Sequence, residues 1–145
     1  RPLWQQEIIK RGADTEEEPP EEEVLAFEGE TAPEWYQKGG ESFRRNCASC
    51  HVSGGMAPSL ETSEWAGSPP ESLIKILLHG KRGNRGVMTP FAWMDDDEIA
   101  AILSYIRVQW HDKREPVRTR AVNQIREQYG GRTELWTDEE LKSDQ

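Results

Sequence analysis

Apolar side chains recur at helical spacing in several stretches of the chain, and the clearest stretch begins with the acidic residues 95–98. Acidic side chains favour the positive end of a helix dipole. The apolar positions that follow are three or four residues apart: Ile99, Ile102, Leu103, Ile106 and Trp110. A second helix is predicted after Ser68 and its two following prolines, with the apolar run 73–78 as its buried content and Gly80 as its end.

Three further helices are predicted from shorter sequence patterns. One follows Pro33 and carries Trp35, Tyr36 and Phe43 toward the cysteines. Another opens at Pro116, carries Val117, Ala121, Ile125 and Tyr129, and ends at Gly130 and Gly131. Thr137 and Glu140 form a capping-box pattern for a last short turn. No strand pattern or internal repeat is visible, so the predicted fold class is all-α.

The stretches between these helices have different compositions. Residues 1–12 are compatible with a short helix, whereas residues 14–23 are almost wholly acidic with two prolines, which is typical of a solvated linker. Residues 51–70 are rich in Gly, Ser and Pro and predict an irregular loop, and residues 81–86 predict a basic glycine-rich loop. We therefore expect an N-terminal segment with a linker (1–33), a central domain (34–111) and a helical C-terminal extension (112–145).

Composition and charge narrow the function. The hydrophobic fraction of 34% is low for a chain of 145 residues, so a bound apolar group is expected to help fill the interior. The net charge of -9 excludes nucleic acid as a partner and favours a basic protein surface. No apolar run approaches the roughly 18 residues of a membrane span. Because the chain begins at Arg1, we expect either that a targeting segment has been removed or that the chain was cut from a longer one.

The only two cysteines lie in the string Cys47-Ala48-Ser49-Cys50-His51. C-x-x-C-H is the haem-attachment signature: two thiols one helical turn apart reach the two vinyl groups of a porphyrin, and the adjacent histidine then lies beneath the iron. A dithiol redox motif would need a strand-to-helix context, and a zinc site would need a second cysteine pair. Neither context is present in the sequence. The motif therefore predicts one haem c, bound covalently through Cys47 and Cys50.

Residues 34–111 resemble a class I monohaem cytochrome c. The resemblance is carried, in order, by YQKGGESFRRNCASCH, MAPSL, GVMTPF and DDDEIAAILSYIR. It implies a fold of about three or four short helices wrapped around one covalent haem. It also implies that the helix before the motif crosses the closing helix where Gly39 or Gly40 and Phe43 meet Tyr105 or its neighbours.

The same resemblance implies the residues around the haem. The Pro58 carbonyl is expected to accept a hydrogen bond from the ring nitrogen of His51 that does not face iron, and Met88 is expected to be the sixth ligand opposite His51. His79 and His111 are rival ligands, expected instead to lie at helix ends. Met56 and Met94 are expected to be packing residues. Candidate partners of the haem propionates are Arg82, Arg85, Trp65 and Trp93, although a solvated basic loop explains the two arginines equally well.

These features predict a carrier of single electrons between redox proteins outside the cytoplasm, and not an enzyme. The C-terminal stretch, with VNQIREQYGGRTELWTDEEL, resembles the extension on small cytochrome domains that accompany bacterial sugar or alcohol dehydrogenases. One alternative is therefore an electron-transfer subunit docked permanently on a dehydrogenase or on a respiratory or photosynthetic membrane complex. A third interpretation is a haem with an open distal side that binds gases or acts as a peroxidase.

Overall fold

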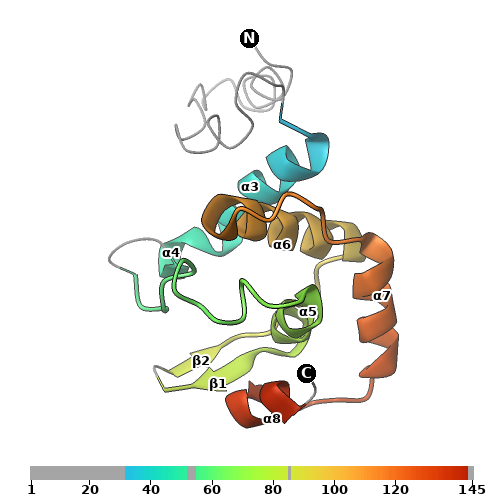
Figure 1. Cartoon of the computed structure of the whole chain (residues 1–145). Coiled ribbons are helices and arrows are strands. Elements are labelled where there is room, and N and C mark those ends of the chain that lie inside the picture. The colour runs from blue at the N-terminus through green and yellow to red at the C-terminus, as the bar shows by residue number, and fades with distance from the viewer. Residues whose placement is uncertain (1–31, 52–54, 85, 144–145) are drawn as a thin grey trace.

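The computed structural model of the protein describes residues 32–51, 55–84 and 86–143. The predicted helix at 1–12 and the acidic linker at 14–23 lie outside these residues. Helices dominate the described part, which confirms the predicted fold class (Figure 1). Its helices are α3 (Glu34–Asn46), α4 (Ala48–His51), α5 (Pro70–His79), α6 (Asp96–His111), α7 (Thr119–Gln128) and α8 (Asp138–Ser143). Within these residues, no helix is both long and apolar enough to cross a membrane.

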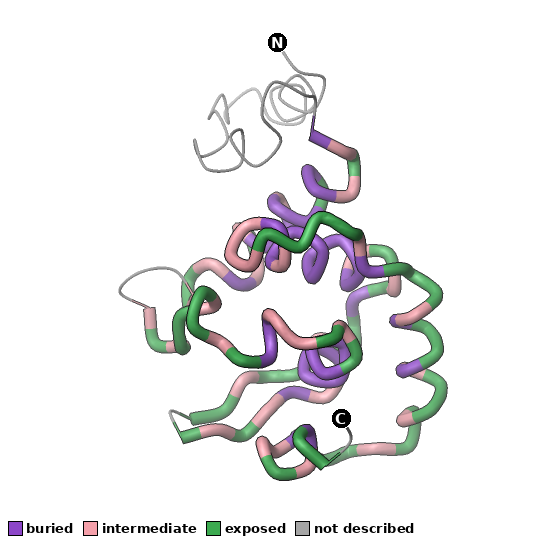
Figure 2. Tube along the Cα trace, in the orientation of Figure 1, coloured by how far each residue is buried: buried purple, intermediate pink, exposed green. Residues whose placement is uncertain are grey.

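Helix α6 is the central element, and its start is set by the acidic cluster. Asp95 is the N-cap, and its side chain accepts a 2.9 Å hydrogen bond from the backbone N–H of Glu98. The helix ends where Asp112 adopts a left-handed conformation with φ of 51° and the N–H of Lys113 donates to the carbonyl of Arg107. Every residue from 99 to 106 is buried, so α6 is surrounded by the rest of the fold (Figure 2).

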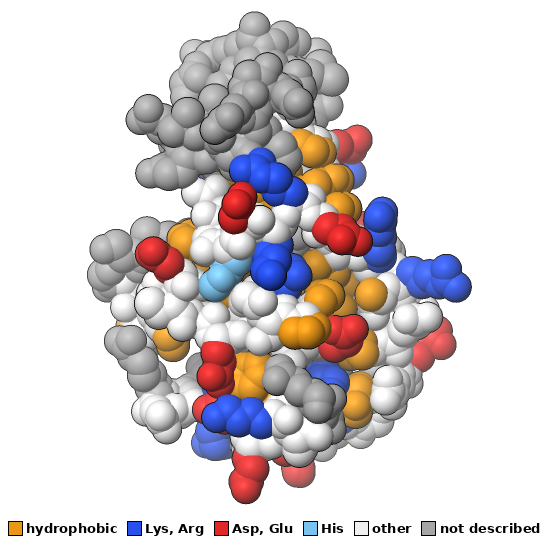
Figure 3. Space-filling view, in the orientation of Figure 1, with side chains coloured by type: hydrophobic (Ala, Val, Ile, Leu, Met, Phe, Trp, Pro, Cys, Tyr) orange, Lys and Arg blue, Asp and Glu red, His pale blue; other side chains and the backbone are white. Residues whose placement is uncertain are grey.

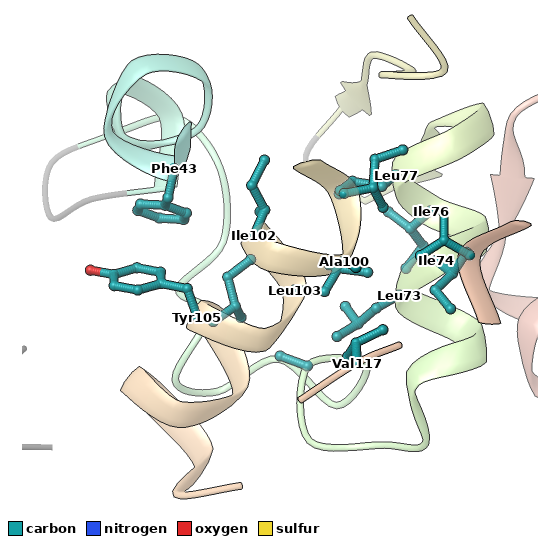
Figure 4. Packing of buried hydrophobic residues seen from close by; sticks show 14 of the residues in the cluster. Phe43, Leu73, Ile74, Ile76, Leu77, Ala100, Ile102, Leu103, Tyr105 and Val117 are labelled. Carbon is teal, nitrogen blue, oxygen red and sulfur yellow. The ribbon is translucent and has the colours of Figure 1, made fainter. Parts of the chain in front are cut away.

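Helices α3 and α6 cross at Gly39, which settles the alternative between Gly39 and Gly40. A Cβ atom on Gly39 would lie 2.0 Å from the carbonyl oxygen of Ala101 and 2.8 Å from Cβ of Tyr105. The two backbones can approach this closely only because Gly39 has no side chain. Beside the crossing, the rings of Phe43 and Tyr105 lie 5.5 Å apart, as the resemblance implied (Figure 4).

Helix α5 lies on the other side of the core and is buried on all faces. It begins at Pro70 with Pro69 as its N-cap and ends at His79, and the C-cap Gly80 has a φ of 80°, which suits glycine. Leu73, Ile74, Ile76, Leu77 and Leu78 are all buried, as predicted. Figure 4 shows several of these side chains beside Ala100, Leu103 and Val117, so α5, α6 and the start of the C-terminal extension share one core.

Three short strands form a small sheet that the sequence did not predict. Strands β1 (Lys81–Gly83) and β2 (Gly86–Met88) make an antiparallel hairpin, and β3 (Trp136–Thr137) pairs in parallel with β1. The strand order is β2-β1-β3. Residues 81–86 are therefore not simply a loop. Strands this short show no alternation of apolar and polar residues, and the pairing of β1 depends on residues far away in the chain.

The C-terminal extension wraps around the helical core, with α7 at one edge of the molecule and α8 below the hairpin (Figure 1). Helix α7 begins at Thr119, so Pro116 precedes the helix and does not open it. The predicted capping box is confirmed: Thr137 Oγ1 accepts from the N–H of Glu140, and a Glu140 carboxylate oxygen accepts from the N–H of Thr137. Val122, Ile125, Trp136 and Leu141 anchor the extension in the core. The division into three parts stays a prediction.

Candidate functional site

The two cysteines lie where α3 passes into α4. Cys47 is the C-cap of α3, and its N–H donates to the carbonyl of Phe43 over 2.8 Å. Its own carbonyl accepts from the N–H groups of Cys50 and His51, at 3.1 and 3.0 Å. The motif therefore forms one turn of helix, with Cys47 buried at the edge of the core and Cys50 exposed. This turn presents two thiols and an imidazole within five residues of chain.

The surroundings of Cys47 do not suit the attacking thiolate of a dithiol redox site. Burial raises the pKa of this thiol to about 12, with smaller contributions from Cys50 and Glu98. A dithiol redox site needs the opposite, because its attacking group is a thiolate whose pKa has been lowered.

The His51 ring is oriented by the loop that follows it. Nδ1 of His51 lies 3.1 Å from the carbonyl oxygen of Pro58. The N–H of Ala57 donates to the carbonyl of Cys50 over 2.9 Å, which helps to turn the chain back toward α4. Because a carbonyl only accepts, Nδ1 carries the proton in this contact, and Nε2 keeps a lone pair for a metal ion.

Met88 is the last residue of β2 and lies directly opposite Lys81 in the hairpin. Its side chain is half-buried against the hydrophobic core. The other two methionines are placed differently: Met94 is buried in the core, whereas Met56 is 81% exposed. In Figure 1, α4 and the β1–β2 hairpin lie on the same side of the molecule, away from α7.

The two rival histidines contact other parts of the fold. His111 is the last residue of α6, and its Nε2 lies 2.8 Å from the carbonyl oxygen of Leu60. His79 is the last residue of α5, and its ring packs against Trp136 with centroids 6.4 Å apart. Burial lowers the pKa of His79, and the nearby Arg132 lowers it further. Each histidine thus packs at the end of its helix.

The four candidate partners of the haem propionates differ in accessibility. Arg82 is exposed on β1, and Arg85 lies outside the described residues. Trp65 is buried, and its indole N–H donates to Oδ1 of Asp138 over 3.1 Å. Trp93 is 68% exposed. The indole N–H of Trp65 is thus already hydrogen-bonded to another residue of the protein.

The side chains present suit a haem. Two thiols one turn apart suit attachment to the two vinyl groups of a porphyrin, and an imidazole with a free Nε2 and a soft thioether are donors that haem iron takes. Val87 and Trp93, which neighbour Met88 in sequence, expose 52% and 68% of their surface. Apolar side chains left open in this way have surface available for contact with a large apolar group.

One cavity among the described residues lies elsewhere. It has a volume of about 430 Å³ and is lined by Trp35, Ala100, Pro116 and Arg118, among other residues. Its lining includes neither cysteine, nor His51, nor Met88. The candidate haem site is thus identified by its cysteine, histidine and methionine side chains and not by this cavity.

Sequence reasoning missed several polar residues near the candidate ligands. Lys81, opposite Met88, forms a 2.9 Å ion pair with Asp138 of α8. Arg126 of α7 donates to the carbonyls of Ala92 and Met94, just after β2. No local motif in the sequence announces these contacts, because each joins residues that are far apart in the chain.

Comparisons with known proteins identify a family and several relatives. Residues 35–106 match the family model described as cytochrome c oxidase, cbb3-type, subunit III. Cytochrome c-552 of Thermus thermophilus is 32% identical over 93 residues, which cover 52% of this chain and 71% of that protein. For a second cytochrome c-552 of the same species the identity is again 32% over 93 residues, and the match covers 63% of that protein. Cytochrome c55X of Stutzerimonas stutzeri is 35% identical over 63 residues, which cover 41% of this chain and 54% of that protein.

None of these names mentions a sugar or alcohol dehydrogenase, so the resemblance of the C-terminal stretch to such domains stays a prediction. The haem resemblance is different, because the family model and the three relatives agree on it. The match to the first cytochrome c-552 of Thermus thermophilus covers 71% of that protein, which is most of its length. The chain therefore belongs to the cytochrome c family, as a monohaem c-type cytochrome that transfers electrons through a covalently attached haem c.

Proposed function

We propose that the protein carries single electrons between redox proteins, that Cys47 and Cys50 would hold its haem covalently, and that His51 and Met88 would be the iron ligands. The arrangement of the motif supports this assignment most directly. Both thiols and the imidazole lie on one helical turn, and Nδ1 of His51 is held 3.1 Å from the Pro58 carbonyl. The chain has no other cysteine to form a thioether bond.

Each proposed ligand has a distinct task. The haem supplies one-electron chemistry, its iron alternating between the ferric and ferrous states. The Pro58 carbonyl fixes the ring of His51 and raises its basicity as a ligand. The Met88 thioether, as the second ligand, would raise the reduction potential relative to a pair of imidazoles. With both axial positions filled, no position would be left for a substrate, so we propose a carrier and not an enzyme.

We place the carrier outside the cytoplasm, where it would meet partners with basic docking surfaces. The acidic charge is concentrated before the helical domain: residues 1–31 hold ten acidic and three basic side chains. The face of the described part seen in Figure 3 instead mixes acidic and basic side chains. The N-terminal segment (1–33) would therefore steer the association with a partner. The other two parts of the chain would be a haem domain (34–111) and a C-terminal extension (112–145).

Arg82 and Arg85 remain proposed partners for the haem propionates. Arg82 is exposed on β1, in the strand paired with the one that carries Met88. A guanidinium group can donate two parallel hydrogen bonds to a carboxylate, which suits this task. Arg85 follows in the same hairpin sequence but lies outside the described residues.

Extraction with acidified organic solvent tests the covalent attachment. Thioether bonds survive conditions that release haem held by iron coordination alone, so the colour should stay with the denatured protein. The double variant Cys47→Ser, Cys50→Ser should lose stable haem, whereas Ser49→Ala, which changes the same turn but keeps both thiols, should retain it. Haem that partitions from the native protein into the organic phase would refute the assignment of the two cysteines.

A second candidate function is a subunit that stays docked on a larger assembly. The matching family model is described as a subunit of a cbb3-type cytochrome c oxidase, which favours this alternative. The extension, anchored in the core through Trp136 and Leu141, offers additional surface for such docking. Copurification of a stable partner at high salt would support the docked subunit, and purification of the protein alone in full yield would support the free carrier.

A further inference from the structure

The segment that joins α5 to α6, residues 80–95, carries Met88 and is attached to the C-terminal extension at both of its ends. We call this stretch the methionine segment. It contains the β1–β2 hairpin and the turn before α6. Its hairpin is only partly covered: Val87, next to Met88, is 52% exposed. Packing therefore restrains the hairpin less than the end of the segment, where Met94 is buried in the core.

The first attachment lies at the start of the segment. The N–H of Trp136 donates to the carbonyl of Gly80 over 2.9 Å, and β3 pairs with β1. Nζ of Lys81 lies 2.9 Å from Oδ1 of Asp138, and the side chain of Lys81 is only 18% exposed. The same carboxylate oxygen accepts from Nε1 of Trp65. The hydrogen bond from Lys81 contributes most to lowering the pKa of Asp138, so this carboxylate is charged at neutral pH.

The second attachment lies at the end of the segment and is made by Arg126 of α7. Its Nη1 donates to the carbonyl of Ala92 over 2.9 Å, and its Nη2 donates to the carbonyl of Met94 over 2.7 Å. Its Nε lies 2.8 Å from Oδ1 of Asp96, in the first turn of α6. One planar guanidinium thus joins the turn that follows β2 to the start of the central helix.

We infer that the C-terminal extension is a brace for the axial methionine, with Arg126 and Asp138 as positioning residues that hold Met88 in place. This inference rests on the proposed ligation by Met88. Lys81, which Asp138 holds, is the residue directly opposite Met88 in the hairpin. Arg126 holds Ala92, four residues after Met88. When either attachment is lost, the segment departs more often from its bound arrangement, and Met88 leaves the iron more often.

Cyanide binding to the oxidised holoprotein measures this effect, because cyanide can enter only when Met88 has left. Asp138→Asn removes a charge at nearly constant side-chain size, and Arg126→Gln removes the guanidinium group while keeping a polar, unbranched side chain. Each variant should raise the rate of cyanide binding about tenfold, since a hydrogen bond to a charged group contributes that much or more to an equilibrium. Each should also lower the pH at which the near-infrared band of Met-to-ferric ligation disappears.

Matched controls separate loss of the brace from a general change in surface charge or in stability. Arg120→Gln on α7 and Glu139→Gln on α8 change exposed charges in the same helices, and both should bind cyanide at the wild-type rate. Val117→Ala removes buried methyl groups of the same extension and should lower the unfolding midpoint without raising the cyanide rate. A rate increase in Val117→Ala equal to that in Arg126→Gln, at equal loss of stability, would show that the brace does not exist.

The same experiment distinguishes the failure of the brace from the failure of the proposed ligation. Wild-type cyanide rates in both Arg126→Gln and Asp138→Asn, with the methionine band present in the native protein, overturn the brace and leave the ligand assignment in place. A native protein without that band, or a band that survives Met88→Ala, overturns the proposed ligation and the brace together.

Discussion

Gly39 of α3 packs directly against the backbone carbonyl of Ala101 in α6, with no space for a side chain between them. We predict that Gly39→Ala destabilises the protein by about 3 kcal/mol, because the added methyl group meets rigid backbone atoms of α6. Chemical denaturation of the holoprotein, followed by circular dichroism, measures the change. The two helices would have to separate to relieve the contact, and the turn that carries Cys47 would move with α3.

Gly131 provides the matched control for this prediction. A Cβ atom at Gly131 would meet no atom within 4 Å, so Gly131→Ala should change the free energy of unfolding by less than about 1 kcal/mol. Equal destabilisation by the two alanine variants would contradict the close contact between α3 and α6.

Substitution of the proposed axial methionine should change the spectrum of the oxidised protein. Met88→Ala should remove the near-infrared charge-transfer band, lower the reduction potential and open the sixth position to cyanide or carbon monoxide. His79→Ala and His111→Ala should keep the band, because His79 packs on Trp136 and His111 contacts the Leu60 carbonyl. Retention of the band in Met88→Ala would transfer the ligand role to Met56 or Met94.

The stability of the protein should depend on pH through His79. Burial, and then Arg132 and Arg126, lower the pKa of this imidazole below its ordinary value of 6.5, although a hydrogen bond to the Tyr129 backbone acts in the opposite direction. Below pH 6.5 the unfolded chain therefore binds a proton that the folded protein does not bind until the pH is lower. The free energy of unfolding should fall as the pH drops from 6.5 through the folded-state pKa.

His79→Gln tests this dependence, since glutamine does not titrate. The difference between the unfolding free energies of the native protein and the variant should shrink or reverse as the pH falls below 6.5. Denaturant titrations at a series of pH values measure it. A constant difference from pH 8 to pH 5 would show that the His79 pKa is the same in the folded and unfolded chains.

Electron transfer to the physiological partner should slow as salt is raised, if the two proteins meet by diffusion. Steering by the acidic residues 14–23 acts on the encounter rate and is screened over about 8 Å at physiological ionic strength. Stopped-flow rates across a salt series should fall, and a shortened chain beginning at Glu30 should react more slowly at low salt. A salt-independent rate within a copurifying complex would support the docked subunit, and a rate that rises with salt would indicate an acidic contact surface on the partner.

The cofactor and most of the helices could be predicted from the sequence, because they depend on residues within a few turns of one another. Helix α6 starts where Asp95 caps it, and the C-x-x-C-H motif contains both thiols and the imidazole in one turn. The Thr137–Glu140 capping box is equally local. The hairpin could not be predicted in this way, because its strands are too short to show a pattern and β1 pairs with Trp136 and Thr137.

The sequence by itself determined the chemistry of the protein: two cysteines and a histidine in one helical turn can be read without a fold. Only the tertiary structure decided how the parts support one another. It selected Gly39 for the helix crossing and buried Lys75 of α5 against the rings of Tyr129 and Trp136. It also brought Arg126 and Asp138 to the two ends of the methionine segment. These contacts join residues that are distant in the chain, and no local periodicity or spacing encodes which distant residues will meet.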